Sequence, residues 1–430
     1  MKKLPFFCCC LATLLYPTAL NAQTNWTRCS EGLPEDKIVF SLAQIGTTLF
    51  AGTSKAGVYK SDNNGNSWQP MPPHAAFLQT TAGSMAVIDT FLFVGQIGKG
   101  VLRTSLHDTA WVLLTNGLLN KSVQDLIAVG NTLYAATYGG GVFYSSDMGN
   151  SWSTLHDNLG MDDQKVFALA NNATTLFAGT QGIDALPDTG VAYRTTFGGT
   201  EWNRINTGFI RNGVHLEQVF SMDANDSLVF AGTDDVGLFR STDNGDNWVP
   251  VGGYNGDIRA IKIVGETVYY GTHFGGAYRS LDAGQNWSAD NTGFVFGNMT
   301  LPNFVKDFLV VGPLIYAASD IGVFKQAIPN MVSGAEQPGT EAAAIWLSNY
   351  PNPFSEATTI QFYNPSAGSV ALRLVDMTGK AWATLLQKEM PEGDYRVNFD
   401  GGHLPDGLYY VQLETTERGN FQAIKVLKQN

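Results

Sequence analysis

The sequence predicts an all-β protein, in which a seven-bladed β-propeller, its last blade closed by an N-terminal strand, precedes a small Ig-like β-sandwich. Three observations support this fold class. The 430 residues include 47 glycines, 12% aromatic residues and only 15% charged residues, a composition typical of short strands joined by tight turns. A unit of strands and turns recurs along residues 23–330. Residues 346–430 alternate apolar and polar side chains in a different pattern.

The first segment, residues 1–22, is predicted to be a signal peptide. Two lysines precede an apolar run from Leu4 to Leu15, and small residues follow up to an expected cleavage site after Ala22. The apolar run is too short to span a bilayer, so no transmembrane anchor is expected. A lipoprotein is the alternative, but Cys8–Cys10 lie inside the apolar run. The mature chain keeps only Cys29, which excludes an internal disulfide.

The repeats of residues 23–330 are marked by a turn motif, S-x-[DN]-x-G-x-[SN]-W, that we call the box. The four complete boxes comprise Ser61, Asn63, Gly65 and Trp68; Ser145, Asp147, Gly149 and Trp152; Ser241, Asp243, Gly245 and Trp248; and Ser280, Asp282, Gly284 and Trp287. Two degenerate copies end at Trp111 and Trp202, and in the second Phe197 replaces the acid. A Gly-apolar-aromatic strand precedes each box, and a strand such as LFAGT precedes that one.

The two ends of the repeat region complement each other. Trp26 has no inner strands before it, whereas the last strand pair, which ends at Lys325, has no tryptophan after it. The two halves form one unit if the chain closes into a ring. Division of residues 23–330 into seven gives about 44 residues a unit, the length of a four-stranded propeller blade. An open solenoid is the alternative, but it would leave strand edges exposed.

The box predicts a structural turn. An acid or amide such as that of Asp147 can accept hydrogen bonds from turn amides, Gly149 permits a positive φ, and Trp152 can bury its ring between units. These repeats resemble the Asp-box, or BNR, repeats of sialidase-like propellers. The resemblance implies that each box joins the third and fourth strands of a blade, on the face opposite the ligand.

Ligand contacts are therefore expected from the loops between the second and third strands and from the connections between blades. We expect Tyr138, His273, Phe274 and Arg211 on this face, together with Phe294. Weak catalytic candidates are the carboxylates of the same loops, Asp184, Asp188, Asp234 and Asp235.

Several function classes find little support. The formal net charge of −12 disfavours nucleic acid as a partner. Sialidases bind the carboxylate of their substrate with three arginines. This chain offers no such triad, because most of its arginines occupy repeat positions beside the boxes. A glycoside hydrolase that uses the loop carboxylates remains the alternative to a binding protein. The histidines show no metal-ligand spacing, and no cofactor motif is present, so we expect neither metal nor cofactor.

Residues 331–345 lack strand alternation and have the composition of a linker. The segment 346–430 closely resembles the type A sorting domain of the type IX secretion system of Bacteroidota. The matches are Tyr350–Phe354 (YPNPF), Asp376–Gly379, Gly393–Tyr395, the strand from Leu404, and Lys425. The resemblance implies recognition by the secretion machinery, and attachment to surface lipopolysaccharide after removal of the tail. A carbohydrate-binding sandwich is the alternative.

The sequence therefore favours a secreted or cell-surface propeller that binds a glycan, a protein or a peptide without converting it. Glycine-rich loops and loop aromatics around the propeller axis suit such a ligand.

Overall fold

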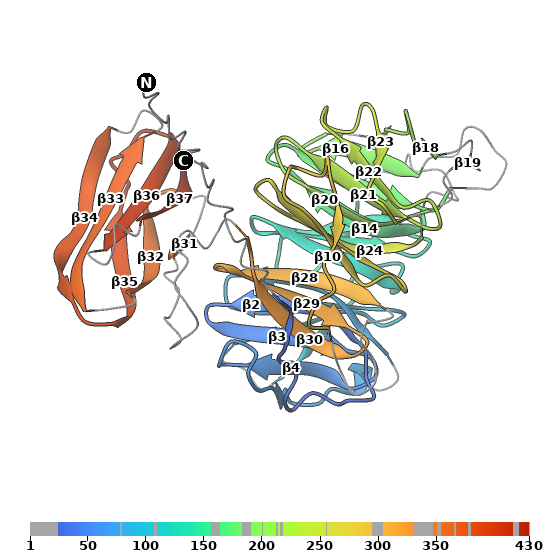
Figure 1. The fold of residues 1–430 in the computed structure, drawn as a ribbon, viewed down its shortest axis with the longest axis horizontal. Coiled ribbons are helices and arrows are strands. Elements are labelled where there is room, and N and C mark those ends of the chain that lie inside the picture. The colour runs from blue at the N-terminus through green and yellow to red at the C-terminus, as the bar shows by residue number, and fades with distance from the viewer. Residues whose placement is uncertain are drawn as a thin grey trace, which may run out of the picture.

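The computed structural model consists almost entirely of β-strands (Figure 1). It describes residues 25–77, 80–106, 110–155, 164–182, 191–199, 201–211, 214–215, 218–254, 256–294, 304–329, 347–350, 354–364, 367–376, 380–415 and 421–429. One short 3-10 helix, η1 (Ala75–Phe77), interrupts the strands of the described residues. The predicted signal peptide and linker lie outside these residues.

Seven antiparallel sheets of four strands account for the described residues up to 329. The first three comprise β2 (Val39–Ile45), β3 (Thr48–Thr53), β4 (Gly57–Ser61) and β5 (Gln69–Pro70); β6 (Ala82–Ile88), β7 (Phe91–Gln96), β8 (Gly100–Ser105) and β9 (Val112–Leu114); and β10 (Val123–Val129), β11 (Thr132–Thr137), β12 (Gly141–Ser145) and β13 (Ser153–Thr154). The next three comprise β14 (Val166–Asn171), β15 (Thr175–Thr180), β16 (Ala192–Thr196) and β17 (Asn203–Arg204); β20 (Val219–Ala224), β21 (Val229–Thr233), β22 (Leu238–Ser241) and β23 (Val249–Val251); and β24 (Ile258–Val264), β25 (Thr267–Thr272), β26 (Ala277–Ser280) and β27 (Ser288–Ala289). A small hairpin of β18 (Ile210–Arg211) and β19 (Val214–His215) lies between the fourth and fifth sheets in the chain.

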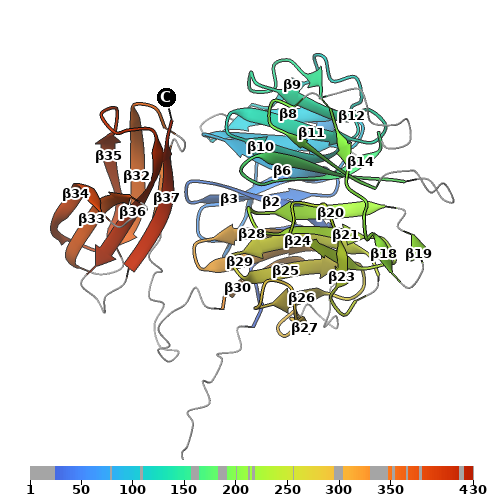
Figure 2. The ribbon, with the colours of Figure 1, turned by 90° about the horizontal axis from the view of Figure 1, so that it is seen from above.

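The seventh sheet joins the two ends of this region. It contains β28 (Val305–Val311), β29 (Leu314–Ser319) and β30 (Gly322–Ala327), and its fourth strand is β1 (Thr27–Arg28). Thr27 pairs with Lys325 and Arg28 pairs with Phe324. The first strand of each sheet contacts the first strand of the next, in the order β2, β6, β10, β14, β20, β24, β28 and back to β2. The sheets therefore form a closed β-propeller around these first strands (Figure 2).

The position of a strand within its sheet determines how far its residues are buried. The second strands β3, β15 and β25 are buried at every position, because a neighbouring sheet covers each of their faces. The fourth strands β5, β13 and β17 are exposed and only two residues long, which limits the free edge at the rim.

Tryptophans link neighbouring sheets through their indole N–H groups. Five of them donate Nε1–H to a backbone carbonyl of the preceding sheet: Trp26 to Asp290, Trp68 to Cys29, Trp111 to Pro72, Trp202 to Leu155 and Trp248 to Ile205, at 2.8–3.0 Å. Trp152 Nε1 is buried without a partner among the described residues, and Trp287 donates within its own turn to Gly284, at 3.0 Å. The recurrence of the tryptophans thus reflects packing between sheets.

A glycine six residues after some tryptophans makes a second link. Gly208 adopts a φ of +93°, and a Cβ there would lie 2.1 Å from the carbonyl oxygen of Trp248. The backbone N–H of Trp248 donates to Thr207, at 2.8 Å. Gly32, Gly117 and Gly293 stand in the same relation to other tryptophans. Only glycine permits this close approach with this φ.

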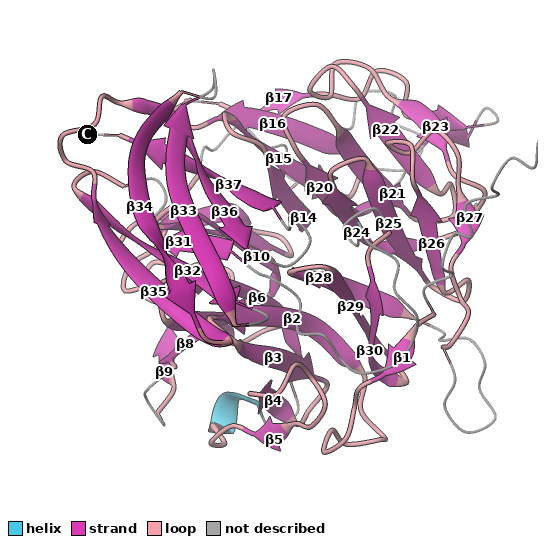
Figure 3. Cartoon of the chain, turned by 60° about the vertical axis from the view of Figure 1, so that its left-hand side comes forward, coloured by secondary structure: helices cyan, strands magenta, loops and turns pink. Residues whose placement is uncertain are grey.

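The C-terminal segment forms two further antiparallel sheets that share one core. One contains β31 (Leu347–Tyr350), β32 (Ala357–Asn364) and β35 (Gly393–Asp400); the other contains β34 (Ala381–Met390), β33 (Gly368–Asp376), β36 (Gly407–Thr415) and β37 (Phe421–Lys428) (Figure 3). Phe362 and Val411, one from each sheet, are fully buried in the core between them. Trp382, an aromatic residue of β34, is 41% exposed.

Motif residues of the C-terminal segment have structural roles. Phe354 is buried in the core, and its carbonyl accepts the N–H of Gln429 at 2.9 Å. The Asp376 carboxylate accepts the N–H of Lys380 at 3.1 Å and the indole N–H of Trp382 at 3.0 Å. These contacts tie the motifs to the turns and strand ends of the sandwich.

Candidate functional site

The boxes form tight turns between third and fourth strands. In the third sheet, Ser145 Oγ donates to Asp147 Oδ1 and accepts the N–H of Gly149, both at 2.8 Å. Asp147 Oδ1 also accepts the N–H of Ser151 at 2.9 Å. The same bonds recur around Asp243 and Asp282, and Asn63 accepts the equivalent N–H of Ser67 at 2.9 Å. An amide oxygen serves as well as a carboxylate here, which is what a structural turn requires.

Electrostatics agree with this role. Hydrogen bonds from Ser151 and Ser145 lower the pKa of Asp147 to about 2, and those from Asn286 and Ser280 lower the pKa of Asp282 to about 2. Each carboxylate stays ionised and already accepts several local donors. A carboxylate in this state is a poor proton donor, so the boxes are not expected to supply a general acid.

Substitutions in one box should separate its two contributions. Asp147→Ala removes exposed turn bonds and should lower the free energy of unfolding by about 1 kcal/mol. Trp152→Ala removes a ring that is only 4% exposed and should cost about 3–5 kcal/mol. Urea unfolding measures both. Equal costs, or loss of ligand binding by a variant of unchanged stability, would contradict the structural role.

The opposite face of the propeller carries the loops between second and third strands. We call it the loop face. Isolated bridges pair these loops with the residues that enter the next sheet: Ser54 with Thr81, Tyr138 with Lys165, Gln181 with Gln218, and His273 with Phe304. The first strands also begin at this face. Their first residues therefore surround the axis beside the loops, in a position to contact a ligand.

Aromatic and cationic side chains form a continuous series at this end of the axis, which we call the axial arc. Its members are Tyr138, Lys165, Phe167, Phe220, Arg259, Asp257, His273, Phe304, Lys306 and Phe40. They come from the third to the seventh sheets, with their connecting loops, and from the first.

Neighbours along the arc are in direct contact. The rings of Tyr138 and Phe167 lie 5.7 Å apart, and those of Phe167 and Phe220 lie 5.3 Å apart. The Arg259 guanidinium lies 3.7 Å from the centre of the Phe220 ring and pairs with the Asp257 carboxylate.

The contacts continue on the other side of Asp257. Its Oδ2 lies 3.3 Å from His273 Nδ1, and the His273 ring stacks on Phe304 at 4.1 Å. Lys306 Nζ then lies 4.5 Å from the Phe304 ring centre and 5.5 Å from that of Phe40. The arc thus offers flat apolar surface with three cations, Lys165, Arg259 and Lys306, set into it, a combination suited to organic ligands.

The surroundings of the arc lower the pKa values of two of its charged groups, Asp257 and Lys306. Although burial opposes ionisation of Asp257, its bonds to Arg259 and His273 and the Arg259 charge lower its pKa. Burial and the neighbouring Arg259 charge lower the pKa of Lys306 to about 8. Perturbed groups of this kind gather at functional sites.

The predicted ligand-face residues fall partly within this arc. Tyr138 and His273 belong to it, and Phe274 stacks on His273 at 3.7 Å. Phe274 is 65% exposed and has a φ of +69°, an uncommon backbone conformation for an aromatic residue. Arg211 lies in β18, in the connection between the fourth and fifth sheets.

One loop aromatic is placed differently from expectation. Phe294 was expected at the open face, but it is fully buried and stacks on Trp26, with the ring centroids 4.8 Å apart. It follows Gly293, whose close approach to the Trp26 backbone brings the Phe294 ring against the indole.

Among the predicted carboxylates, Asp234 and Asp235 lie in one loop of the fifth sheet. Burial raises the pKa of Asp234, whose Oδ1 accepts the N–H of Gln218 at 3.1 Å. The N–H of Asp235 lies 3.4 Å from Asp257 Oδ1, which brings this loop against the arc. Asp184 and Asp188 lie outside the described residues.

Sequence reasoning missed Asp257, Arg259 and Lys306. Arg259 and Lys306 are the second residues of their strands, each preceded by a fully buried apolar residue, and Phe40, Phe167 and Phe220 hold the same position. Alternation along a strand would therefore have placed all five on the same, axial side. The aligned repeats contain this signal at the second position of each first strand.

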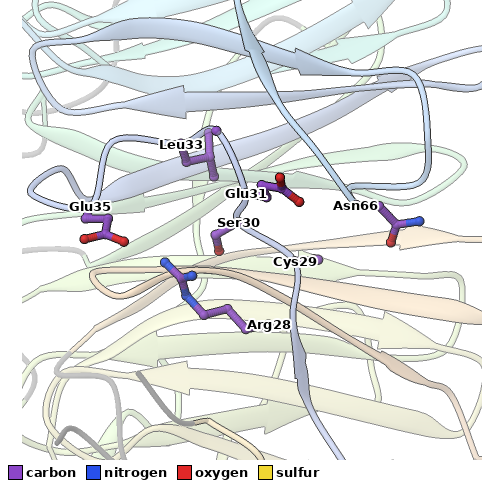
Figure 4. A pocket seen from close by; sticks show the side chains of 8 residues that line it. Arg28, Cys29, Ser30, Glu31, Leu33, Glu35 and Asn66 are labelled. Carbon is purple, nitrogen blue, oxygen red and sulfur yellow. The ribbon is translucent and has the colours of Figure 1, made fainter. Parts of the chain in front are cut away.

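A polar cavity of about 420 Å³ lies elsewhere, where the N-terminal segment meets the first sheet (Figure 4). Arg28, Glu31, Glu35 and Asn66 line it. Arg28 already donates to the carbonyl of Ile321, at 3.4 Å. The cavity belongs to the seam of the ring and is not part of the axial arc.

The described part of the chain contains no group of three or more His, Cys, Asp or Glu side chains arranged to hold a metal ion. None of its helices is long and apolar enough to cross a membrane.

Comparison with known families identifies the C-terminal segment. Residues 348–427 match the family described as the secretion system C-terminal sorting domain. The chain therefore ends in a type IX sorting domain, and the protein is secreted or exposed at the cell surface of a Bacteroidota bacterium. Comparison with curated proteins gave no match.

Solved structures support the propeller fold. YCF48 bound to D1 peptide aligns with a TM-score of 0.54 at 16% identity, over 71% of this chain and 97% of that one. PorZ, a surface component of the type IX secretion system of Porphyromonas gingivalis, aligns at 0.52 and 16% identity, over 93% of this chain and 60% of that one. The extracellular domain of the two-component system BT3049 from B. thetaiotaomicron aligns at 0.54 and 13% identity, over 95% and 58%. At such identities the likeness shows the fold alone.

Proposed function

We propose that the protein is a secreted binding module, in which a seven-bladed Asp-box propeller (residues 23–330) holds its ligand on the loop face and does not convert it. The single observation that carries the proposal is the axial arc. It brings aromatic and cationic side chains together around one axis from sheets far apart in the sequence. Structural packing alone does not require cations at this position, whereas a few charged groups placed among apolar ones are typical of ligand sites.

Two further points fit this function. YCF48, a neighbour in fold, is bound to a D1 peptide in its structure, so a propeller of similar architecture can hold a peptide. The tail, which we propose to be an Ig-like sandwich over residues 346–430, delivers the propeller to the surface through the type IX machinery. Removal of the tail with attachment to lipopolysaccharide would leave the loop face free for a ligand.

Loss of one arc ring should weaken binding without loss of the fold. The mature chain would be screened on peptide and glycan arrays, and every ligand found would be retested with Phe220→Ala. We expect at least tenfold weaker binding, because this ring supports Arg259 at 3.7 Å. Phe197→Ala, on the box side, is the matched control and should bind normally. Equal binding by Phe220→Ala would show that the ligand site lies elsewhere.

A glycoside hydrolase is the second candidate, favoured by one observation. Burial raises the pKa of Asp234, whereas bonds to Arg259 and His273 lower that of Asp257 despite its burial. Carboxyl groups with opposite shifts are the usual arrangement of a general acid and its ionised partner. A panel of glycosides distinguishes the two functions: turnover that Asp257→Asn abolishes supports the hydrolase, and binding without turnover supports the binding module.

A further inference from the structure

Lys306 is a partly buried cation with no carboxylate partner among the described residues. No acidic oxygen lies within ion-pair distance of its ammonium group there, in contrast to Lys262, which lies 3.6 Å from Asp223 Oδ2. The Lys306 ammonium instead lies over the rings of Phe304 and Phe40. Such contacts stabilise a cation less than a carboxylate would, since a buried charge is costly unless it is paired.

A second cation acts on Lys306 from the adjacent sheet. Arg259 belongs to the neighbouring first strand, and its charge disfavours the protonated form of Lys306. Asp257 and Asp320 act in the opposite sense, but Asp257 is already bound to Arg259 and His273. Arg259 Nε also lacks a partner within the described residues. Asp320 accepts the N–H of Phe304 at 3.2 Å and makes no ion pair with Lys306. The Lys306 ammonium therefore has no direct anionic partner among the described residues.

We propose that Lys306 and Arg259 bind a carboxylate of a peptide ligand, and that the surrounding rings hold the adjacent apolar side chain. This inference rests on the proposed function and names the ligand of the same site. A carboxylate between the two cations would relieve their repulsion and form charge-assisted hydrogen bonds.

The composition of the arc favours a peptide over an acidic glycan. Five of the seven rings along or beside Arg259 and Lys306 are phenylalanines, at positions 40, 167, 220, 274 and 304; Tyr138 and His273 are the other two. Phenylalanine cannot hydrogen-bond to sugar hydroxyls, whereas it packs well against apolar side chains. The extended series of rings suits a peptide segment with an aromatic or aliphatic residue beside its carboxylate.

The simplest probe is N-acetyl-L-phenylalanine, with its amide as the uncharged control. Titration of the full mature chain, followed by NMR of the probe, should give at least tenfold tighter binding for the acid than for the amide. Lys306→Met should remove this preference. Lys325→Met, which deletes a lysine bonded to Asn64 and Asn66 on the box face, should leave it unchanged.

Binding should also depend on pH in a defined sense. The carboxylate needs the protonated form of Lys306, whose pKa is about 8 in the free protein. Affinity for the acid should therefore fall about tenfold from pH 7 to pH 9, as Lys306 loses its proton. Lys306→Arg keeps the charge at both pH values, so it should bind the acid and lose this pH dependence.

Each outcome decides between the proposals. Equal affinity for the acid and the amide, absence of binding by the acid, or an unaffected Lys306→Met variant would overturn the carboxylate site. If array ligands still depend on Phe220, the binding function would stand without it. A glucuronate disaccharide is the last arm: binding that depends on Lys306, with none of the acid probe, would overturn the assignment to a peptide. Thermal melting confirms that every variant is folded.

Discussion

A protein that lacks residues 23–32 is expected to lose the stable propeller, with a melting temperature about 10 °C lower or aggregation on expression. The deletion removes β1, the fourth strand of the seventh sheet, and exposes the edge of β30. The unpaired N–H and C=O groups of an exposed strand edge can pair with a strand of another molecule, which leads to aggregation.

The expected size of the effect follows from the contacts that are lost. Trp26 is 2% exposed, stacks on Phe294 and donates to the carbonyl of Asp290 at 2.8 Å. Loss of such a ring alone costs about 3–5 kcal/mol. Ser30 also exchanges two hydrogen bonds with Val323, at 2.8 and 2.9 Å. Since 1 kcal/mol shifts the melting temperature of a domain of about 300 residues by about 1.5 °C, these losses together account for a drop approaching about 10 °C, to which the exposed edge adds.

A permuted chain provides the control. It would begin at Leu33, and the box turn Ser61–Ser67 followed by Trp26–Gly32 would be attached after Lys325. The other sheets connect their third and fourth strands in this way, so β1 should return to its place beside β30. Recovery of the melting temperature would show that the strand itself stabilises the ring. A truncated protein that melts like the intact one would refute closure by the N-terminal strand.

How far the sequence predicts this molecule depends on whether a feature is repeated. The boxes are local and recur, so the bonds of Ser145 and Asp147 could be anticipated from one turn and tested against its copies. The closed ring could be inferred because Trp26 has no inner strands before it, whereas the last strand pair, which ends at Lys325, has no tryptophan after it. The two halves form one sheet in the structure. Even here copies differ, since Trp287 is only partly buried and bonds within its own turn.

The contacts within the axial arc could not be predicted in the same way. Phe220 and Lys306 hold the same position in their repeats, but they belong to different sheets, and the contacts of the arc exist only once the ring has closed. The sequence indicated that Tyr138 and His273 lie on the loop face, because loops of one kind share an edge. It did not indicate that Phe294 is buried against Trp26, since that contact follows from the close approach of Gly293 to Trp26.

Export should depend on the tail alone. A protein that ends at residue 330 is expected to stop in the periplasm of a host with the type IX machinery, because residues 348–427 form the sorting domain. The same truncated propeller should still bind its ligand, since the axial arc lies wholly within residues 40–306. Cell fractionation and the array measurement test these two expectations separately.

The converse experiment asks whether the tail suffices. Residues 331–430 fused behind a signal-bearing fluorescent protein should carry that protein to the cell surface, a change from essentially none to most of the cargo. The tail should fold in the fusion because its core, which includes Phe362, Val370 and Val411, is built from its own residues. Val411→Asp places a carboxyl group at a fully buried position of that core and should unfold the tail and abolish export. Retention of the unmodified fusion in the periplasm would show that the propeller contributes to sorting, and export of the Val411→Asp fusion would show that the machinery reads a linear segment rather than the folded sandwich.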